Sequence, residues 1–529
     1  QGDPLVGAYV RVKQGKKTWT VQTDETGKYV INLPAGLSTA GLSVAVSDIG
    51  MQRQVKGTKA GVMHYDFMLE DNSKSLGEAV VTGYGTISTR EKTSSITSLK
   101  MDEILMPGMT SLEQALEGRV PDMVFMQNSG EVGATARMRI RGTSTLIGNR
   151  EPLWVLDGIP LSDPVDVTNE QLNDPDYINY IGNAISGLNP QDIERVDVLK
   201  DAAATALYGT RAANGVIVVT TKKGEPGPPR ITYNAQFKYT ARPRYTDSNI
   251  NLMNSQERVR FGQDLVNLHY AFPNHMTMVG YEGAYHRYVT GQIDYDTFVA
   301  EARQAETANT DWFGLLTHDT FNHNHTISLS GGSETARYYA SLGYNKEEGV
   351  QLRHRNDRYT ASLNMQTRIA KVIQANVRLN ANVQKKEQLP GEIDPLGYAY
   401  GTTRALPAFN NDGSYYYYQR HAYNVGTDKD GQYKYRYNIL NEIDNTEKNY
   451  SSNGIMAALD LTYRFRQLLD FTLTTSYQRN TSDNDTWFGE KSNYVAQLRN
   501  SEYGVDPIPG QYGKSDLPYG GVYNSGRNV

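Results

Sequence analysis

The stretch Ile373-Gln374-Ala375-Asn376-Val377-Arg378-Leu379-Asn380-Ala381-Asn382-Val383-Gln384 alternates apolar and polar side chains without interruption. Successive side chains of a β-strand point to opposite faces, so this stretch predicts a strand with one apolar and one polar face. The same alternation runs from Ile231 to Thr240. Five further strands are predicted at residues 325–330, 337–344, 358–366, 455–465 and 471–478. Residues 230–529 are therefore predicted to form one large, mainly β structure.

Alternation alone fits a soluble β-sandwich as well as a membrane barrel, but the connections between the strands favour a barrel. The longer connections are 241–324, 345–357 and 385–454, and the tight ones between them are 331–336, 367–372 and 466–470. Long outer loops and short periplasmic turns are typical of transmembrane antiparallel β-barrels, whose tilted strands of about ten residues cross the bilayer. No run of about 18 apolar residues predicts a membrane-spanning helix.

The composition excludes several classes of protein. The 529 residues include no cysteine, which excludes disulfide scaffolds, thiolate metal sites and cysteine nucleophiles. The formal charge is −5, and a near-neutral chain without a basic block is a poor candidate for nucleic-acid binding. No nucleotide-binding G-x-x-x-x-G-K-[ST] loop is present. We expect no metal and no cofactor, because His323 and His325 share a strand face without an evident third ligand.

The first 229 residues divide into three predicted parts. Residues 1–70 contain short strands predicted at 5–12, 18–23, 28–33, 43–46 and 64–69, with turn residues at Asp24 and Gly27. This part is similar to the carboxypeptidase regulatory-like domain, a small β-sandwich whose first strand would precede Gln1. Residues 71–91 are expected to be a linker. Residues 92–229 are expected to be an α+β domain, in which a helix from Ala202 to Tyr208 joins two strands.

Longer motifs resemble the TonB-dependent outer-membrane transporters. They are Glu78-Ala79-Val80-Val81-Thr82-Gly83-Tyr84-Gly85, Ile140-Arg141-Gly142 and the runs 152–158 and 189–204. The runs 207–216, 309–312 and 338–344 are similar to the SusC-like branch of this family from Bacteroidetes. The resemblance implies a barrel of about 22 strands in the outer membrane of a Gram-negative bacterium, with 92–229 as a plug domain in the lumen. Residues 230–529 would be the N-terminal part of that barrel.

The same resemblance implies active import across the outer membrane. The segment Glu78–Gly85 would be the TonB box, on which TonB pulls with energy from ExbB–ExbD. A SusD-like surface lipoprotein would be the lid of the pore. Pairing of an added strand through its backbone suits such pulling, because it transmits load along the chain. The residues alone leave an ordinary interdomain linker as the alternative.

Three arginines are candidate contacts between plug and barrel. Arg137, Arg139 and Arg141 share one face of a predicted strand, with Met138 on the other face. We expect them to contact the barrel wall through bonds that must break for transport. The alternative is a solvated or salt-bridged strand face.

The candidate substrate contacts are Asn149 and Arg150 in an apical plug loop and four consecutive tyrosines, Tyr415-Tyr416-Tyr417-Tyr418, in the connection 385–454. Aromatic faces in a loop stack on the apolar faces of sugar rings. The alternative for the tyrosines is loop packing or a membrane girdle.

The implied substrate is an oligosaccharide, and the alternative within the family is an oligopeptide. A soluble, secreted glycan-binding β-protein is the alternative outside it. We do not expect an enzyme, because Asp and Glu are too scattered to nominate the carboxylate pair of a glycoside hydrolase.

Overall fold

The computed structural model describes most of the chain. The described residues are 7–14, 17–34, 41–47, 54–59, 62, 64–69, 79–82, 85–88, 96–127, 129–140, 151–161, 184–200, 206–272, 277–370, 372–421, 434–465, 469–499, 501–505 and 519–528. The chain forms two compact units, residues 1–95 and 96–529.

The first unit contains a four-stranded antiparallel sheet in the order β2-β1-β3-β4. Its strands are β1 (Tyr9–Gln14), β2 (Lys17–Gln22), β3 (Ser43–Ser47) and β4 (Gln54–Gly57). The strands predicted at 28–33 and 64–69 are wrong. Neither segment forms a strand with another described segment, although apolar side chains of both pack on the sheet. The predicted turn is confirmed, since the Asp24 carboxylate accepts hydrogen bonds from the backbone amides of Thr26 and Lys28.

The second unit contains an inner domain, residues 96–222, built on the five-stranded sheet β11-β10-β13-β12-β7. Its elements are β7 (Ile96–Lys100), α1 (Met101–Ile104), α2 (Leu112–Leu116), β8 (Met123–Met126), β9 (Arg137–Ile140), β10 (Leu153–Leu156), β11 (Ile159–Pro160), η4 (Pro190–Asp192), β12 (Ile193–Leu199), η5 (Ala206–Ala212) and β13 (Val216–Thr221). All six residues of β13 are buried. Of the helix predicted from Ala202 to Tyr208, residues 202–205 lie outside the described residues, and the rest belongs to a 3₁₀ segment that runs past Gly209, whose φ is 68°.

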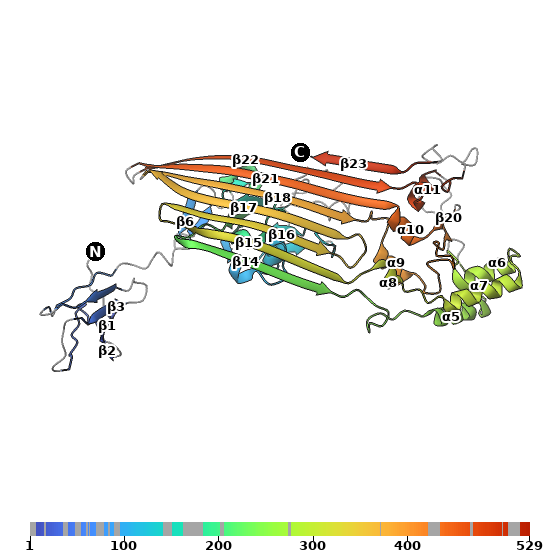
Figure 1. Ribbon diagram of the computed structural model, residues 1–529, viewed down its shortest axis with the longest axis horizontal. Coiled ribbons are helices and arrows are strands. Elements are labelled where there is room, and N and C mark those ends of the chain that lie inside the picture. The colour runs from blue at the N-terminus through green and yellow to red at the C-terminus, as the bar shows by residue number, and fades with distance from the viewer. Residues whose placement is uncertain are drawn as a thin grey trace. The chain divides into compact units, whose positions relative to one another are not determined.

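The rest of the second unit contains an eight-stranded antiparallel sheet, here called the wall (Figure 1). Its strands, in spatial order, are β14 (Gly227–Thr240), β15 (Thr320–Gly332), β16 (Ala336–Glu348), β17 (Arg355–Ala370), β18 (Ile373–Gln388), β21 (Thr446–Phe465), β22 (Leu469–Phe488) and β23 (Val522–Asn528). All seven predicted strands are confirmed, and β23 is an eighth that was not predicted. Most are longer than the expected ten residues, and β21 and β22 have 20 each.

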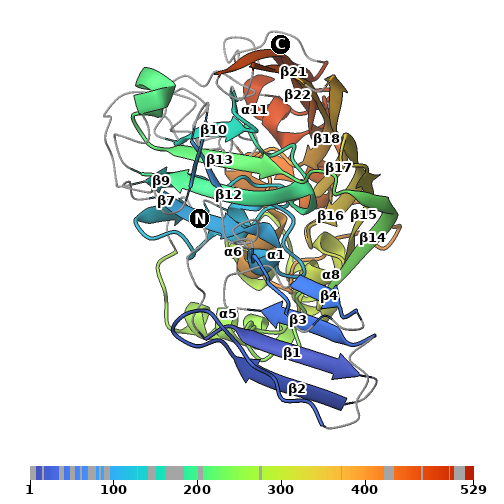
Figure 2. The same ribbon diagram turned by 90° about the vertical axis from the view of Figure 1, so that its left-hand side faces the viewer.

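The two faces of the wall differ as the alternation predicts. Val377 and Leu379 are 39% and 37% exposed on the outer face, whereas Arg378 between them is 5% exposed on the inner face. Leu342 on β16 is 62% exposed. The wall is curved, and the inner domain lies on its concave side (Figure 2). An outer face this rich in apolar side chains requires a lipid or protein cover.

The long connections carry the remaining elements to one end of the wall, and the tight turns lie at the other (Figure 1). These elements are α5 (Ser255–Asn267), α6 (Gly280–Val289), α7 (Tyr295–Ala308), α8 (Trp312–Leu316), α9 (Pro395–Gly401), β19 (Tyr418–His421), β20 (Lys434–Tyr437), α10 (Ile439–Asp444) and α11 (Asn493–Arg499). Asn254 and Glu257 form a capping box that begins α5. Among the described helices, none is long and apolar enough to cross a bilayer.

A buried carboxyl group joins two of these connections. Glu442 of α10 is 3% exposed, and both of its carboxylate oxygens lie 2.9 Å from the backbone nitrogen of Asn493. The side-chain amide of Asn441 also donates to it, at 3.1 Å. Burial raises the pKa of Glu442 from 4.5 to about 7, although these hydrogen bonds oppose the shift.

We predict that Leu342→Arg destabilises the folded protein in lipid vesicles by about 2–4 kcal/mol, because arginine is costly near the bilayer midplane. The measurement is the free energy of unfolding from a urea titration. Leu268→Arg is the matched control, since Leu268 is 78% exposed at the end of α5, outside the wall. Equal tolerance of both substitutions would mean that the outer face of the wall meets water.

We predict that the loop around Glu442 loses stability as pH rises. The folded state holds the Glu442 proton more tightly than the unfolded state, so this stabilisation is complete below pH 4.5 and is lost as pH rises through 7. The predicted loss is about 3 kcal/mol, measured as faster amide hydrogen exchange in α11 after correction for intrinsic rates. Glu442→Gln should abolish this dependence, and an unchanged slope in that variant would contradict the assignment.

Candidate functional site

The interface between the inner domain and the wall is the candidate functional site. Its apolar part is continuous with the core of the inner domain, since Met456 and Ala458 of β21 pack in one cluster with Trp154, Val196 and Ile217. The two bodies therefore share buried surface, and the wall contributes side chains to the core of its neighbour.

Three buried cations of the wall donate hydrogen bonds to backbone carbonyl oxygens of the inner domain. The Arg358 guanidinium reaches the carbonyl oxygens of Thr110 at 2.6 Å and Ser186 at 3.0 Å. The Lys386 ammonium lies 2.6 Å from the carbonyl oxygen of Gly133. Arg358 belongs to β17 and Lys386 to β18, and the polar face of both strands points inward.

Arg378 makes the third contact of this kind. Its guanidinium donates to the carbonyl oxygen of Asp157 in the inner domain, and it lies 2.7 Å from the carboxylate of Asp460 on β21. The carboxylate of Asp157 in turn accepts hydrogen bonds from the backbone amide and hydroxyl of Thr221, at 2.9 and 2.7 Å. The Asp157 turn is thereby fixed both to the inner sheet and to the wall.

Neutral and acidic groups complete the interface. The side-chain amide of Asn189 donates to the Thr326 hydroxyl of β15 at 3.0 Å. The Tyr339 hydroxyl of β16 donates to the Asp192 carboxylate at 2.9 Å. Burial raises the pKa of Asp192, although the hydrogen bonds from Ser341 and Tyr339 oppose the shift.

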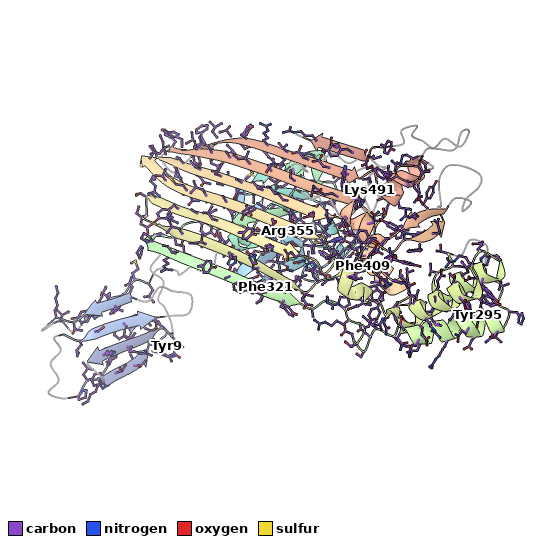
Figure 3. The ribbon with its side chains drawn as sticks, turned by 45° about the vertical axis from the view of Figure 1, so that its right-hand side comes forward. Tyr9, Tyr295, Phe321, Arg355, Phe409 and Lys491 are labelled. Carbon is purple, nitrogen blue, oxygen red and sulfur yellow. The ribbon has the colours of Figure 1, made fainter. Side chains whose placement is uncertain are left out.

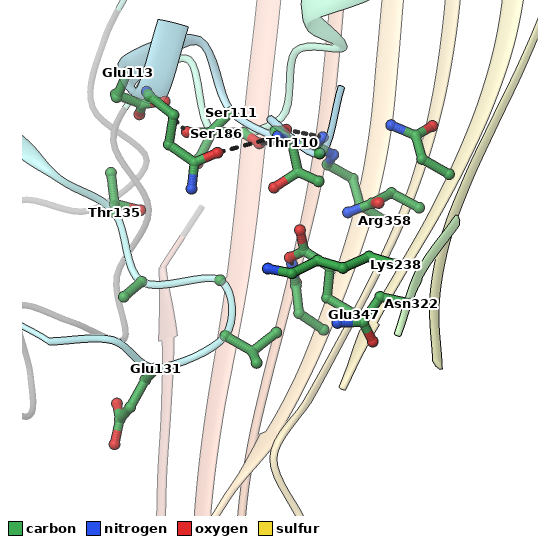
Figure 4. A pocket seen from close by; sticks show the side chains of 18 of the residues that line it. Thr110, Ser111, Glu113, Glu131, Thr135, Ser186, Lys238, Asn322, Glu347 and Arg358 are labelled. Atoms are coloured by element: carbon green, nitrogen blue, oxygen red, sulfur yellow. Dashed lines mark hydrogen bonds between the residues drawn. The ribbon is translucent and has the colours of Figure 1, made fainter. Parts of the chain in front are cut away.

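A polar pocket of about 300 Å³ opens between the two bodies (Figure 4). Glu113 and Glu131 line it from the inner domain, and Lys238, Glu347 and Arg358 line it from the wall. The charged groups on the inner-domain side of the cavity are thus acidic, and the wall side carries charges of both signs. Among the described residues, no group of three or more His, Asp or Glu side chains is arranged to hold a metal ion.

One loop of the inner domain borders both this pocket and a second, of about 280 Å³, because Glu131 lines both. The carboxylate of Glu131 lies 3.8 Å from Nε2 of His354, which is 7% exposed. The imidazole beside it holds the pKa of Glu131 below its usual value. Lys386 binds the same loop at Gly133.

The predicted contacts of Arg137, Arg139 and Arg141 with the wall stay a prediction. Arg137 lies 3.7 Å from Glu151, which also belongs to the inner domain. This contact corresponds to the salt-bridged alternative. Arg139 lies on the same partly exposed face of β9, and Arg141, Asn149 and Arg150 lie outside the described residues.

The wall cations Arg358, Arg378 and Lys386 were missed by the sequence analysis. The only signal for them is a charged residue at an inward-facing position of an alternating strand. That signal does not distinguish a side chain that contacts a plug from one that faces water.

The segment predicted as a TonB box forms a hairpin instead of a single extended strand. Residues Ala79–Thr82 (β5) pair antiparallel with Gly85–Ser88 (β6). Glu78, Gly83 and Tyr84 lie outside the described residues. An isolated two-stranded hairpin is marginally stable in water, so its backbone groups remain available for exchange with another strand.

The four tyrosines are partly buried in the loop end and differ in their surroundings. The Tyr415 hydroxyl donates to Asp444, and the Tyr417 hydroxyl donates to Asn441 at 3.1 Å. Tyr416 and Tyr418 pack against the apolar cluster around Trp312. Burial is the main reason that the pKa values of Tyr416, Tyr417 and Tyr418 are raised. These contacts agree with the loop-packing alternative for most of the run.

Comparison with known proteins identifies the inner domain. The family model for the TonB-dependent receptor plug domain matches residues 88–216. The TonB-dependent receptor SusC of Bacteroides thetaiotaomicron is 28% identical over 490 residues, which are 90% of this chain and 43% of SusC. The TonB-dependent receptor P26 of Formosa agariphila is 28% identical over 426 residues, covering 78% of this chain and 36% of P26. The chain spans less than half the length of these relatives.

The fold agrees with these relationships. The solved structure of the RagAB peptide importer in its open-open state matches with a TM-score of 0.57 at 22% identity, over 79% of this chain and 44% of that one. The inner domain is the plug, and the wall is part of a receptor barrel. This chain therefore contains a TonB-dependent receptor plug domain and is similar over most of its length to the SusC-like TonB-dependent receptors of the Gram-negative outer membrane.

Proposed function

We propose that the protein imports oligosaccharides across the outer membrane in a TonB-dependent manner, as the pore of a SusC–SusD type of complex. A SusD-like lipoprotein is the proposed lid, and TonB with ExbB–ExbD is the proposed energy source. The observation that carries the proposal is the plug–wall interface, in which Arg358, Arg378 and Lys386 bind carbonyl oxygens of the plug.

The energetics of this interface support a need for external work. A hydrogen bond from a charged group contributes about 1.5–3 kcal/mol, so breaking all of these bonds at once costs several kcal/mol. Thermal motion alone rarely breaks several such bonds together. A carbonyl oxygen accepts hydrogen bonds without having to ionise. The same hydrogen bonds therefore form again when the plug returns to the wall.

The segment Glu78–Gly85 is the proposed TonB box. It precedes the plug in the chain, so tension on it reaches the plug through the backbone. We propose that the β5–β6 hairpin opens and that one of its strands pairs with TonB, because the same backbone groups serve both pairings.

The resemblance of the sequence motifs to the SusC-like branch implies a sugar substrate, and the aromatic side chains of Tyr415–Tyr418 suit the apolar faces of sugar rings. Oligopeptides are the second candidate, because the RagAB structure is named as a peptide importer. Uptake by cells of a fluorescent oligosaccharide and of a fluorescent oligopeptide, each competed by the other unlabelled, separates the two candidates.

We predict that deletion of residues 78–85 abolishes energised uptake but leaves substrate binding unchanged. The deletion removes the segment on which TonB is proposed to pull and leaves the plug–wall interface intact. Uptake by intact cells and binding to purified protein are the two measurements. Replacing the same residues with a Gly-Ser segment of equal length is the control for linker length. Continued uptake in the deletion would exclude the coupling role.

We predict that a disulfide between plug and wall blocks uptake reversibly. A Cβ at Gly187 of the plug would lie 2.4 Å from Cγ of Asn382 on β18, so the two positions are within reach of a disulfide, whose Cβ atoms lie about 3.5–4.5 Å apart. Because the chain has no cysteine, Gly187→Cys with Asn382→Cys introduces the only two thiols.

The oxidised double variant should bind substrate without importing it. A reductant, which cleaves the disulfide, should restore uptake. Each single variant is the control for the substitutions themselves. Undiminished uptake by fully cross-linked protein would mean that this part of the plug need not leave the wall.

A further inference from the structure

One cavity in the loop end is separate from the plug–wall pockets. It has a volume of about 780 Å³ and lies between the helices α6 and α7 and the chain segment 405–419. The helices stand at the loop end of the second unit, where Tyr295 and Phe409 are labelled in Figure 3. Ligand sites commonly have volumes of about 300–1,000 Å³, so this cavity has room for a ligand of several rings.

The helical side of the cavity is held together by contacts between α6 and α7. Phe298 of α7 lies 5.3–6.1 Å, between ring centroids, from Tyr281, Tyr285 and Tyr288 of α6. The guanidinium of Arg287 on α6 contacts the carboxylate of Glu301 on α7. These two contacts fix the helices relative to one another, and Arg287 and Glu301 both line the cavity.

Two glycines, Gly280 and Gly283, line the cavity. Gly280 has a φ of 60°, and a Cβ there would approach Ala305 and Ala405 to about 4 Å. A Cβ at Gly283 would lie 2.7 Å from the carbonyl oxygen of Met278. Larger residues at these positions are therefore disfavoured, by backbone strain at the first and by a clash at the second.

The aromatic side is equally well fixed. Tyr416, Tyr417 and Tyr418 line the cavity, whereas Tyr415 does not. The Asn438 side-chain amide donates to the carbonyl oxygen of Tyr416 at 2.9 Å, and the guanidinium of Arg436 lies 4.4 Å from the centroid of the Tyr417 ring. A site whose walls are held before the ligand arrives loses little conformational entropy on binding.

We propose that this cavity is an accessory binding site for a short, neutral oligosaccharide, outside the lumen and distinct from the plug–wall pockets. Aromatic rings on one wall suit the C–H faces of sugars. Planar polar groups on the other, such as those of Gln292 and Gln304, suit sugar hydroxyls. The proposal rests on the proposed import function and adds a capture site to it.

The charges of the lining favour a neutral sugar over a peptide. Arg287 and Glu301 neutralise one another across the helix pair. A charged ligand would have to compete with that ion pair for either partner. A neutral ligand can accept from and donate to the outer edges of both groups without separating them.

The test is binding of maltohexaose, cellohexaose, laminarihexaose and xylohexaose, and of a neutral decapeptide, to the full chain in detergent. Amide hydrogen exchange locates the ligand. We expect one hexasaccharide to protect residues 280–305 and 405–419. Tyr416→Ala should weaken this binding at least about tenfold, and Tyr415→Ala, the adjacent tyrosine outside the cavity, should change it less than about twofold.

Gln304→Trp is a second variant that guards against misfolding. Gln304 is exposed on α7, so a larger side chain there fills the cavity without entering the helix core. It should also weaken binding at least about tenfold. Unchanged binding in both variants, protection elsewhere, or protection by the decapeptide alone would overturn the proposal.

Uptake by cells distinguishes this proposal from the import function. Loss of the accessory site should raise the sugar concentration needed for half-maximal uptake and leave the maximal rate unchanged. If sugar is imported but never protects the cavity, the accessory site is wrong and the import function stands. If the cavity binds sugar but no sugar is imported, the import function fails and the binding site stands.

Discussion

The two-sided strand is the constraint on which the rest of the structure depends. Each strand of the wall presents every second side chain outward and the others inward, so one sequence must satisfy two environments at once. Val377 and Leu379 face outward, and Arg378 between them reaches the plug. The apolar face requires lipid, and the buried cations require partners that lipid cannot supply. The plug supplies them through its carbonyl oxygens.

The choice of backbone acceptors has a consequence for movement. A carbonyl oxygen in a loop binds a cation strongly but has no side chain that must be repositioned. The plug is thus bound at separate points of β17 and β18, by Arg358, Arg378 and Lys386. The apolar contacts of Met456 add buried surface to the interface, and such contacts have no directional requirement. We propose that such an interface stays closed at rest and separates under a directed pull.

The sequence predicted the wall well because period two and connection length are strong local signals. β23 was missed, since its run Val522–Asn528 is mostly polar and its side chains are largely exposed. The segments 28–33 and 64–69 keep the alternation of strands but pack without forming a ladder. The alternation of apolar and polar side chains indicates which face of the segment a residue occupies. It does not indicate whether another strand lies alongside to pair with the backbone.

The site was predicted less well, because long-range pairing decides it. The pattern placed Arg137 on a polar face but could not reveal that Glu151 of the same domain lies beside it. It also could not separate Tyr415, which binds Asp444, from the three tyrosines that follow and line a cavity. The plug motifs, in contrast, were long enough to predict the inner domain and its family.

The most direct test of the central claim is the environment of alternate residues on β18, measured with spin labels in lipid vesicles. The chain has no cysteine, so single cysteines at 376, 377, 379 and 380 can be labelled one at a time. The account predicts collisions with oxygen dissolved in lipid at 377 and 379, and protection at 376 and 380. Collisions with a water-soluble nickel complex at 377 and 379 would contradict it.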